Sequence, residues 1–576
     1  MKRLALPLAA LLFISPAWMA PAQEPQPKRE GAISGRVVAD DGQPLAGARV
    51  MALAAGKAPN AGASQMTTCD AEGNFKVTGL SHGVYSLLAQ APGYVSVQNQ
   101  SRKYRIGESV IIHLVRGGVI TGRVVDEFGE PVVGARVLAD RVRDSEGRPD
   151  TGVAAMNEMN SSRMTDDRGV YRIYGLEPGA YVVGINGASP MFAGMGRTGR
   201  EPPTYHPSSP RASAVEINLR GAEEVTGVDI RSRSARGRSI SGVISGETQG
   251  EGFINSVYVT LTGATDKRLA GMTTLIGGQN FSLHGVEDGE YELRATRFNE
   301  SMDFALSAPR RVTVRGADLG GIELKLLKLG SISGRVVIEP SKAPAGIEDA
   351  CKSADQFTLE EILIELKRDD KTPSVSVSEI LPMGAWGMSD GATPDKDGGF
   401  TMKNLEAGRY WVKTELPDEN WYIRVVTRAA TPKPVDVSRA GVTLKQGEKL
   451  SGIEMIIARG AAGLSGKIVP ASEGAQLPKR LRVHLIPAET AAADDTLRYD
   501  EAPVRGDGAF EFKHIAPGKY LLHTRQIAQN EANDGQARPA AWDAVERAKL
   551  RREAAAAENE IELTPCQRVK DRVIRW

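Results

Sequence analysis

The chain has 576 residues, of which 41% are hydrophobic and 25% charged, and this length predicts about three to six domains because one hydrophobic core cannot cover it. Lys+Arg 72 against Asp+Glu 71 leaves a net charge of +1 with no basic stripe, which excludes the electrostatic footprint of a nucleic-acid binder. Low aromatic content (5%) beside Gly 62 and Pro 32 indicates many short strands joined by turns.

The N-terminus has the pattern of a secretory signal. Lys2 and Arg3 precede an apolar run over residues 4–19 that ends in an A-P-A sequence. The run is short for a bilayer span, so a cleaved signal is favoured over a retained anchor. No Cys follows the cleavage region, which argues against a lipoprotein. We predict a signal peptide over 1–22 and a linker over 23–30, with export to the periplasm, cell surface or exterior.

One strand pattern then occurs five times along the chain. Each copy alternates apolar and polar residues, which is typical of a half-buried strand, and carries a glycine that marks a bulge or a close backbone approach. The copies are Ile33–Val38, Ile120–Val125, Ile240–Ile244, Ile332–Val337 and Leu464–Val469.

A second element of each copy is a turn that delivers an aromatic residue, followed ten residues later by a tyrosine. A strand, a short turn and a return strand fit this length, and a fixed spacing fixes the hairpin register. The two rings are therefore predicted to be core residues rather than ligand contacts. The pairs are Phe75 and Tyr85, Tyr171 and Tyr181, Phe281 and Tyr291, Phe400 and Tyr410, and Phe510 and Tyr520.

The five copies predict an all-β chain, a tandem array of about five β-sandwiches with one helix near the C-terminus. Short links between copies, such as 115–118 and 328–330, leave little room for pivoting. The predicted units are sandwich 1 over 31–116, sandwich 2 with long loops over 117–235, sandwich 3 over 236–328, sandwich 4 over 329–460, and sandwich 5 over 461–576 with a helical insertion over about 541–559.

The combined pattern of I-S-G-R-V-V, a turn with Pro, G-A-R-V, D-x-x-G-x-F/Y and G-L-x-x-G-x-Y resembles the carboxypeptidase regulatory-like (transthyretin-like) domain. It is also similar in architecture to collagen-adhesin B-type repeats and carbohydrate-binding-like β-sandwiches. The match is good in repeats one and two, fair in four and five, and weaker in three. The resemblance implies a seven-stranded Ig-like or prealbumin-like sandwich in a secreted bacterial repeat protein. It implies an accessory or binding role and no reaction.

One motif resembles a catalytic site. The segment Gly79-Leu80-Ser81-His82-Gly83 fits the G-x-S-x-G nucleophile elbow, which requires a strand-to-helix turn above an α/β sheet. The other copies replace Ser81 with Glu or Ala, so a hairpin turn is the favoured interpretation. The seven histidines lack the paired spacing of a zinc peptidase. We therefore predict no catalytic residues, no metal and no cofactor.

Another motif resembles a calcium loop. Asp395, Asp397 and Glu406 stand at its first, third and twelfth positions. The sixth position, which should be glycine, is Phe400. A turn in which Asp side chains bond backbone N–H groups is favoured over a calcium site.

Aromatic residues on loops that break the repeat are the candidate ligand contacts: Tyr205 and His206 in repeat two, and Trp421 and Tyr422 in repeat four. Such rings can stack on sugars, and rigid scaffolds often carry binding residues on loops. The alternative is that they cover the edge of their own sandwich or the next domain.

Three cysteines cannot form a disulfide framework, but Cys351 and Cys566 could pair in an oxidising compartment, leaving Cys69 over.

The sequence thus predicts an exported, non-catalytic binding or structural protein of the cell envelope, directed at polysaccharide or another envelope protein. Two alternatives stay open: a purely mechanical spacer or adhesin stalk, and a hydrolase, or an accessory module of one, with a site between domains. Neither nucleic acid nor a membrane span after signal cleavage is expected.

Overall fold

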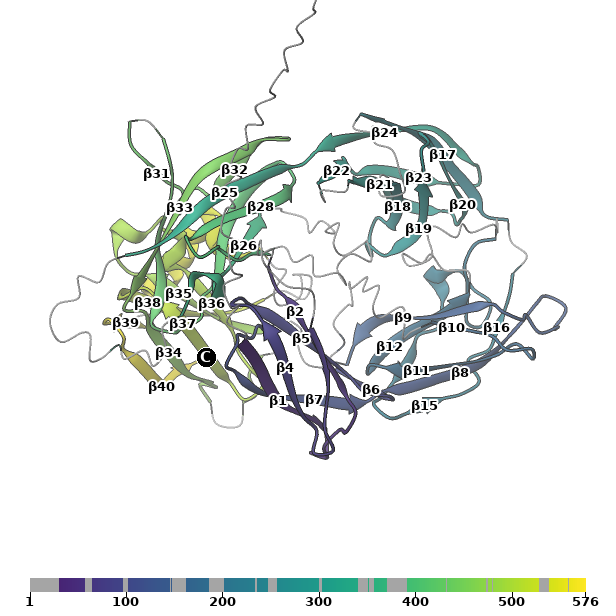
Figure 1. Ribbon diagram of the computed structural model, residues 1–576, viewed down its shortest axis with the longest axis horizontal. Helices are drawn as coiled ribbons and strands as arrows, with labels where there is room; N and C mark the ends of the chain where they lie inside the picture. Colours follow the sequence, from purple (N-terminus) through teal and green to yellow (C-terminus); the bar gives the residue numbers. More distant parts are fainter. Residues whose placement is uncertain are drawn as a thin grey trace, which may run out of the picture.

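Figure 1 shows the computed structural model of the chain, and the predicted signal peptide and linker lie outside the residues that it describes. None of the helices in the described part of the chain is long and apolar enough to cross a membrane. The described residues are 31–56, 65–96, 102–145, 147, 162–185, 201–233, 236–246, 256–299, 303–339, 351, 357–369, 391–430, 432–472, 475–478, 480–527, 538–557 and 559–576.

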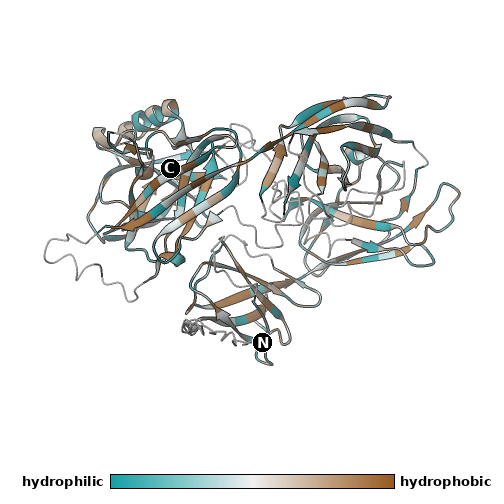
Figure 2. Ribbon diagram, turned by 45° about the horizontal axis from the view of Figure 1, so that its top comes forward, coloured by the Kyte–Doolittle hydropathy of each residue, from teal (hydrophilic) through white to brown (hydrophobic). Residues whose placement is uncertain are grey.

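Within these residues the chain forms β-sandwiches in tandem, each around its own buried hydrophobic cluster, and hydrophobic residues alternate with polar ones along the strands (Figure 2). The predicted all-β array of sandwiches is confirmed. The names sandwich 1 to sandwich 5 refer below to these successive units.

The first two units hold short strands throughout. Sandwich 1 contains β1 (Gly31–Ala39), β2 (Arg49–Ala54), β3 (Gln65–Thr68), β4 (Asn74–Leu80), β5 (Tyr85–Gln90), β6 (Tyr94–Val95) and β7 (Ser109–Arg116). Sandwich 2 contains β8 (Gly118–Val125), β9 (Arg136–Asp144), β10 (Ser162–Met164), β11 (Val170–Leu176), β12 (Gly179–Ile185), β13 (Thr204–Tyr205), the 3-10 helix η2 (Arg211–Ser213), β14 (Ile217–Leu219), β15 (Glu224–Val225) and β16 (Ile230–Arg231).

The third and fourth units are also built mainly from strands. Sandwich 3 contains β17 (Arg238–Gly246), β18 (Val257–Gly263), β19 (Leu269–Leu275), β20 (Asn280–Val286), β21 (Gly289–Phe298), β22 (Phe304–Ser307), β23 (Arg310–Val314) and β24 (Leu319–Lys328). Sandwich 4 contains β25 (Gly330–Ile338), η4 (Leu359–Glu361), β26 (Leu363–Arg368), β27 (Gly391–Ala392), β28 (Gly399–Leu405), β29 (Gly408–Glu415), β30 (Trp421–Arg428), β31 (Val435–Asp436), β32 (Val442–Leu444) and β33 (Lys449–Arg459).

The last unit also carries the predicted helix. Asp543 caps it, accepting hydrogen bonds from the backbone N–H groups of Val545 and Glu546, and the buried Leu550 packs on Ile486 of the sheet beneath. Sandwich 5 contains β34 (Ala462–Val469), β35 (Leu481–Pro487), η6 (Thr490–Ala492), η7 (Thr496–Arg498), β36 (Asp500–Pro503), β37 (Ala509–Ile515), β38 (Gly518–Gln526), η8 (Ala540–Trp542), α4 (Ala544–Ala556), β39 (Glu560–Leu563) and β40 (Arg568–Arg575).

A common sheet topology underlies all five units. The first strand of each pairs antiparallel with the strand that carries the aromatic residue and parallel with a strand at the end of the unit, giving the orders β4-β1-β7, β11-β8-β15, β20-β17-β24, β28-β25-β33 and β37-β34-β40. In sandwiches 1, 2, 4 and 5 a second sheet forms around β2, β9, β26 and β35. In sandwich 3, β18 belongs to the same eight-stranded sheet as β17, because β22 pairs with both β21 and β24.

The repeated glycine of the first strand is fixed by close backbone approach, as predicted. A Cβ on Gly122 would lie 2.0 Å from the carbonyl oxygen of Val228, between the parallel strands β15 and β16, and 2.9 Å from the Tyr171 hydroxyl. Only a residue without a side chain leaves room for both the strand and the core ring. The corresponding distance from a Cβ on the glycine to the nearest carbonyl oxygen would be 1.9 Å at Gly35, 1.9 Å at Gly242, 2.2 Å at Gly334 and 2.0 Å at Gly466.

The tyrosine of each repeat closes its hairpin with one hydrogen bond. The phenol donates to the carbonyl oxygen of the residue four positions earlier, which satisfies a polar group that would otherwise be buried unpaired. These bonds run from Tyr85 to Ser81 (2.7 Å), Tyr181 to Glu177 (2.7 Å), Tyr291 to Glu287 (3.0 Å), Tyr410 to Glu406 (2.7 Å) and Tyr520 to Ala516 (2.6 Å).

Consecutive sandwiches are joined almost strand to strand. Gly117 alone separates β7 from β8, Leu329 alone separates β24 from β25, and Gly460 and Ala461 separate β33 from β34. A Cβ on Gly117 would lie 2.7 Å from the Cα of Gly175, so this junction is also closely packed. Such links restrict pivoting between the units that they join.

Replacing the repeat glycine is expected to destabilise its sandwich. In Gly466→Ala the new methyl group would meet the carbonyl oxygen of Arg572 at 2.0 Å, and the resulting overpacking should cost about 2–3 kcal/mol. Gly506→Ala is the matched control, because a Cβ on Gly506 would have no atom within 4 Å. Calorimetry of the full chain should show a lowered transition only for Gly466→Ala; equal transitions would contradict the close-approach account.

Removing the tyrosine hydroxyl tests the hairpin bond. Tyr520 is fully buried, and its hydroxyl also accepts a hydrogen bond from Nε of Arg498 at 2.8 Å. Tyr520→Phe should therefore lower the free energy of unfolding by about 1–2 kcal/mol, measured by urea denaturation. An unchanged urea midpoint would show that the hydroxyl contributes nothing.

Candidate binding surfaces

The catalytic-looking serine belongs to a hairpin. The segment 79–83 joins β4 to β5, which are both strands, and the carbonyl oxygen of Ser81 accepts the Tyr85 hydroxyl bond. Its neighbour His82 places Nδ1 3.1 Å from Oε1 of Glu361 in sandwich 4. The geometry is a strand-to-strand turn rather than a nucleophile elbow.

The calcium-like loop is also a turn. Oδ1 of Asp395 accepts hydrogen bonds from the backbone N–H groups of Asp397 (2.9 Å) and Gly399 (2.8 Å). Glu406 instead pairs with Arg294 of sandwich 3, at 2.7 Å between Oε2 and Nη2. In the part of the chain that the structure describes, no three His, Cys, Asp or Glu side chains are grouped to hold a metal ion.

Tyr205 lies at the junction of sandwiches 2 and 3. It is only 7% exposed, and the guanidinium of Arg211 sits 5.5 Å from its ring centroid and donates to its hydroxyl at 3.2 Å. Arg211 also pairs with Asp140 (2.6 Å) and with Asp266 of sandwich 3 (3.7 Å). Burial raises the pKa of Tyr205. A stacking sugar needs an open ring face, so the structure does not support the predicted ligand role of this ring.

His206 follows in the same loop and is half-buried. Its Nδ1 lies 2.5 Å from the carbonyl oxygen of Asp229, which ties the loop to the strand region after β15. The peptide bond between His206 and Pro207 is cis. The imidazole thus serves a contact within sandwich 2.

Trp421 and Tyr422 begin β30 at the junction of sandwiches 4 and 5, and both are half-buried. The Trp421 ring meets Phe357 edge-on, with centroids 5.4 Å apart and planes at 81°. Its carbonyl oxygen accepts a hydrogen bond from Nδ1 of His514 in sandwich 5 at 2.9 Å. Burial raises the pKa of Tyr422. The Trp421 ring thus packs against its own sandwich, as the alternative interpretation has it, and its backbone carbonyl contacts the next one.

A disulfide and a ring stack hold sandwiches 4 and 5 together. Cys351 and Cys566, the two cysteines that the sequence suggested could pair, are bonded with Cα atoms 5.4 Å apart, and Cys69 is a buried free thiol. Trp411 of sandwich 4 stacks on Trp542 of sandwich 5, with centroids 5.8 Å apart and planes at 17°. A stable disulfide is typical of an oxidising compartment.

Sandwich 1 packs on sandwich 4, although two units separate them along the chain (Figure 1). Ala55 and Val84 of sandwich 1 form a small buried apolar cluster with Leu363 of sandwich 4. Nε of Arg105 donates to the backbone carbonyl oxygen of Glu361 at 3.0 Å. The side-chain carboxylate of the same Glu361 contacts His82. The array therefore folds back on itself.

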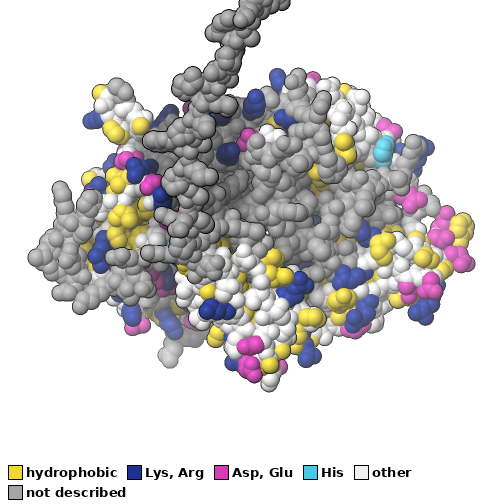
Figure 3. Space-filling view, viewed as in Figure 1, with side chains coloured by type: hydrophobic (Ala, Val, Ile, Leu, Met, Phe, Trp, Pro, Cys, Tyr) yellow, Lys and Arg dark blue, Asp and Glu magenta, His cyan; other side chains and the backbone are white. Residues whose placement is uncertain are grey.

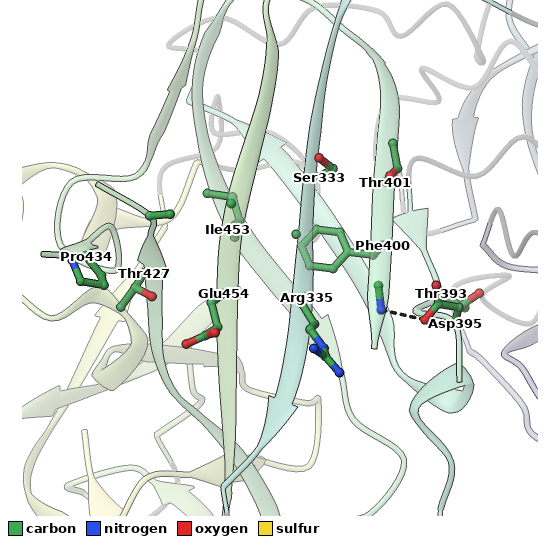
Figure 4. A pocket seen from close by; sticks show the side chains of 14 residues that line it. Ser333, Arg335, Thr393, Asp395, Phe400, Thr401, Thr427, Pro434, Ile453 and Glu454 are labelled. Atoms are coloured by element: carbon green, nitrogen blue, oxygen red, sulfur yellow. Dashed lines mark hydrogen bonds between the residues drawn. The ribbon is translucent and has the colours of Figure 1, made fainter. Parts of the chain in front are cut away.

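An open groove crosses the outer face of the sheet β28-β25-β33-β30 in sandwich 4 (Figure 4). It has a volume of about 620 Å³. Arg335 and Glu454 stand side by side on adjacent parallel strands in its centre, and Thr393 and Pro434 lie at opposite ends. No sequence motif pointed to this surface.

Residues 32–114 match the model of the carboxypeptidase regulatory-like domain. Sandwich 1 matches this domain family. The regulatory-like sandwich covers the first of the five units, and it carries the glycine, ring and tyrosine that the later units share. No curated protein matches the chain.

Similar solved structures include the TIE protein of Bacillus anthracis, at 14% identity and a TM-score of 0.14 over 51% of this chain and 50% of that one. The minor pilin GBS52 of Streptococcus agalactiae is 14% identical, with a TM-score of 0.19 over 36% of this chain and 97% of the pilin. The major pilin BcpA of Bacillus cereus is 11% identical, with a TM-score of 0.13 over 52% of this chain and 100% of the pilin. The chain thus spans half the length of the TIE protein.

A buried histidine, His484, lies on β35 in the last sandwich, on the sheet that helix α4 covers. His484 is 6% exposed and faces His523 across the strand pair β35 and β38. Burial, with added repulsion from His523, Arg525 and Arg482, lowers the pKa of His484 from 6.5 to about 4. The folded protein therefore holds this imidazole neutral at pH values where the unfolded chain protonates it.

Acid should weaken sandwich 5 through this residue. Because the folded pKa lies below the unfolded one, stability is full above about pH 6.5 and falls by up to about 3 kcal/mol as the pH drops to about 4. His484→Gln should flatten this dependence, whereas the exposed-site control His113→Gln should not. Calorimetry across pH 7.5 to 4 measures it, and identical pH profiles for all three proteins would contradict the assignment.

Proposed function

We propose that the protein is an exported, non-catalytic scaffold of the cell envelope, in which five sandwiches are locked into one closed body that presents fixed surfaces to a partner. The observation that carries the proposal is the contact between sandwiches 1 and 4. It joins units that are not neighbours in sequence, through Arg105, His82 and the apolar cluster around Leu363.

The junctions between neighbouring units support a rigid body. Nη1 and Nη2 of Arg268 in sandwich 3 donate to the Asp140 carboxylate and to the Arg141 carbonyl of sandwich 2. Oδ1 of Asn404 in sandwich 4 accepts from the backbone N–H of Phe304 in sandwich 3 at 2.9 Å. A covalent disulfide secures the final junction. Rigid presentation lowers the ordering cost of binding.

The fate of the two functional-looking motifs supports a non-catalytic role, because Ser81 of the elbow-like motif and Asp395 of the calcium-like motif both serve turns. The predicted signal peptide and the disulfide both favour export. Lys, Arg, Asp and Glu side chains are interspersed over the visible surface (Figure 3), in keeping with a partner other than nucleic acid. Polysaccharide or another envelope protein is the proposed partner class.

A stalk-like spacer is the less favoured role. A stalk gains its length from sandwiches in a line, and the return of sandwich 1 to sandwich 4 shortens the body instead. A hydrolase would need an interdomain cleft with convergent titratable groups. The junctions at Tyr205 and Trp421 are filled by ring contacts and ion pairs.

Small-angle scattering of the full mature chain tests the closed body. A compact protein of this size has a radius of gyration of about 24 Å, whereas five 100-residue sandwiches in a line would give roughly 50 Å. We expect a value much nearer the lower figure. A radius near the upper figure would overturn the proposal.

Arg105→Glu should open the contact, because it places a carboxylate against the carbonyl oxygen of Glu361 and beside that of Glu415. The scattering radius should then rise. Lys76→Glu makes the same charge change at an exposed position of β4, outside this contact, and should leave the radius unchanged. An unchanged radius in Arg105→Glu would show that its bonds do not hold the contact.

A further inference from the structure

The groove on sandwich 4 is built by the register of its sheet. Thr401 on β28 pairs with Ser333 on β25, and Glu454 on β33 pairs with both Arg335 on β25 and Thr427 on β30. Residues opposite each other share a face, as do residues two apart on one strand, so these five side chains form one polar patch across four strands (Figure 4). Thr401 and Ser333 form one row of the patch, and Arg335, Glu454 and Thr427 form the next. Gly334, Gly399 and Gly452 also line the groove and contribute no side chains to fill it.

A buried hydroxyl without a partner marks one end of the groove. Thr393 is only 3% exposed, and its Oγ1 has no hydrogen-bond partner among the described residues. Leaving such an atom unsatisfied costs stability, and in a folded protein it calls for a specific explanation. A ligand that carries its own hydroxyl groups would supply the missing bond.

Arg335 and Glu454 are the two charged side chains at the centre of the groove. Arg335 donates from Nε to the carbonyl oxygen of Asp397 at 2.9 Å, which fixes the guanidinium, and the residue is exposed. Glu454 is exposed on the adjacent strand. The pair can therefore offer donors and acceptors to the same ligand.

The other regulatory-like repeats show that this pairing is particular to sandwich 4. Arg36 and Arg123 make the same bond to their own turns, at 2.7 Å and 2.9 Å. The residue beside Arg36 on the parallel strand is the apolar Ile111. The residue beside Arg123 is Asp229, whose carboxylate accepts the backbone N–H of Arg123 at 2.8 Å. Neither repeat leaves an arginine and an uncommitted carboxylate together.

From this arrangement we propose that the groove of sandwich 4 binds a neutral oligosaccharide. One cation, one neighbouring anion and a row of hydroxyl groups favour a ligand without net charge that both donates and accepts many hydrogen bonds. A volume of about 620 Å³ lies in the range of small-ligand sites. A peptide fits less well, because strand addition needs a free sheet edge and this groove crosses strands that are already paired.

Isothermal titration calorimetry of the full mature chain tests the inference with four neutral linear hexasaccharides, built from glucose, N-acetylglucosamine, xylose and mannose. We expect at least one to bind. Arg335→Ala and Glu454→Ala should each weaken that binding at least tenfold, since each removes charge-assisted hydrogen bonds. Thr393→Val, which keeps the shape and removes the orphan hydroxyl, should weaken binding without lowering the thermal transition.

Arg123→Ala is the matched control, because it removes an equivalent arginine and its turn bond from sandwich 2. It should leave the hexasaccharide affinity unchanged. Binding of none of the four sugars, equal affinity in Arg335→Ala and the unmodified chain, or tighter binding of a neutral Gly-Ser hexapeptide would each overturn the inference. Those results leave the scattering radius, and with it the scaffold proposal, unaffected.

Discussion

In each sandwich an aromatic ring packs against a glycine of the first strand, and the rest of the structure depends on this contact. In sandwich 2 that glycine, Gly122, lies between the carbonyl oxygen of Val228, in the segment that joins the parallel strands β15 and β16, and the hydroxyl of Tyr171. A side chain there would force either the parallel strand or the ring out of place. The parallel pairing of the first and last strands, which closes the sandwich, is thereby tied to the packing of its core.

This constraint determines which residues are left for binding. Residues that resemble functional motifs by sequence, the nucleophile elbow at Ser81 and the calcium loop at Asp395, are required by the hairpin and turn that hold the ring and the tyrosine in register. Among the described residues, the segments around Tyr205 and Trp421 contribute to junctions with neighbouring units. The outer face of the sheet in sandwich 4 is open in the described part of the chain, and its side chains differ between repeats.

Features that depend on local spacing could be predicted from the sequence. The ten-residue interval between Phe510 and Tyr520 follows from hairpin geometry, and the alanine-rich helix α4 follows from intrinsic propensity. The sequence could suggest the pairing of Cys351 with Cys566 because the chain has only three cysteines. The sequence left the roles of Tyr205 and Trp421 open between ligand contact and packing, since exposure of a loop ring depends on which unit packs against it. The groove was missed because Arg335 and Glu454 are distant in sequence and meet only through parallel strand pairing.

The central claim is that sandwich 1 returns to sandwich 4, and lysine cross-linking with mass spectrometry tests it most directly. Lys103 of sandwich 1 lies two residues before Arg105, whose Nη2 donates to the carbonyl oxygen of Glu415 in sandwich 4 at 3.5 Å. Lys413 lies two residues before Glu415 on β29, so the two lysines stand on segments that touch across this contact. We expect a Lys103–Lys413 cross-link within single molecules, identified by mixing isotopically labelled and unlabelled protein at high dilution. Cross-links confined to consecutive sandwiches, with this one missing, would contradict the closed body.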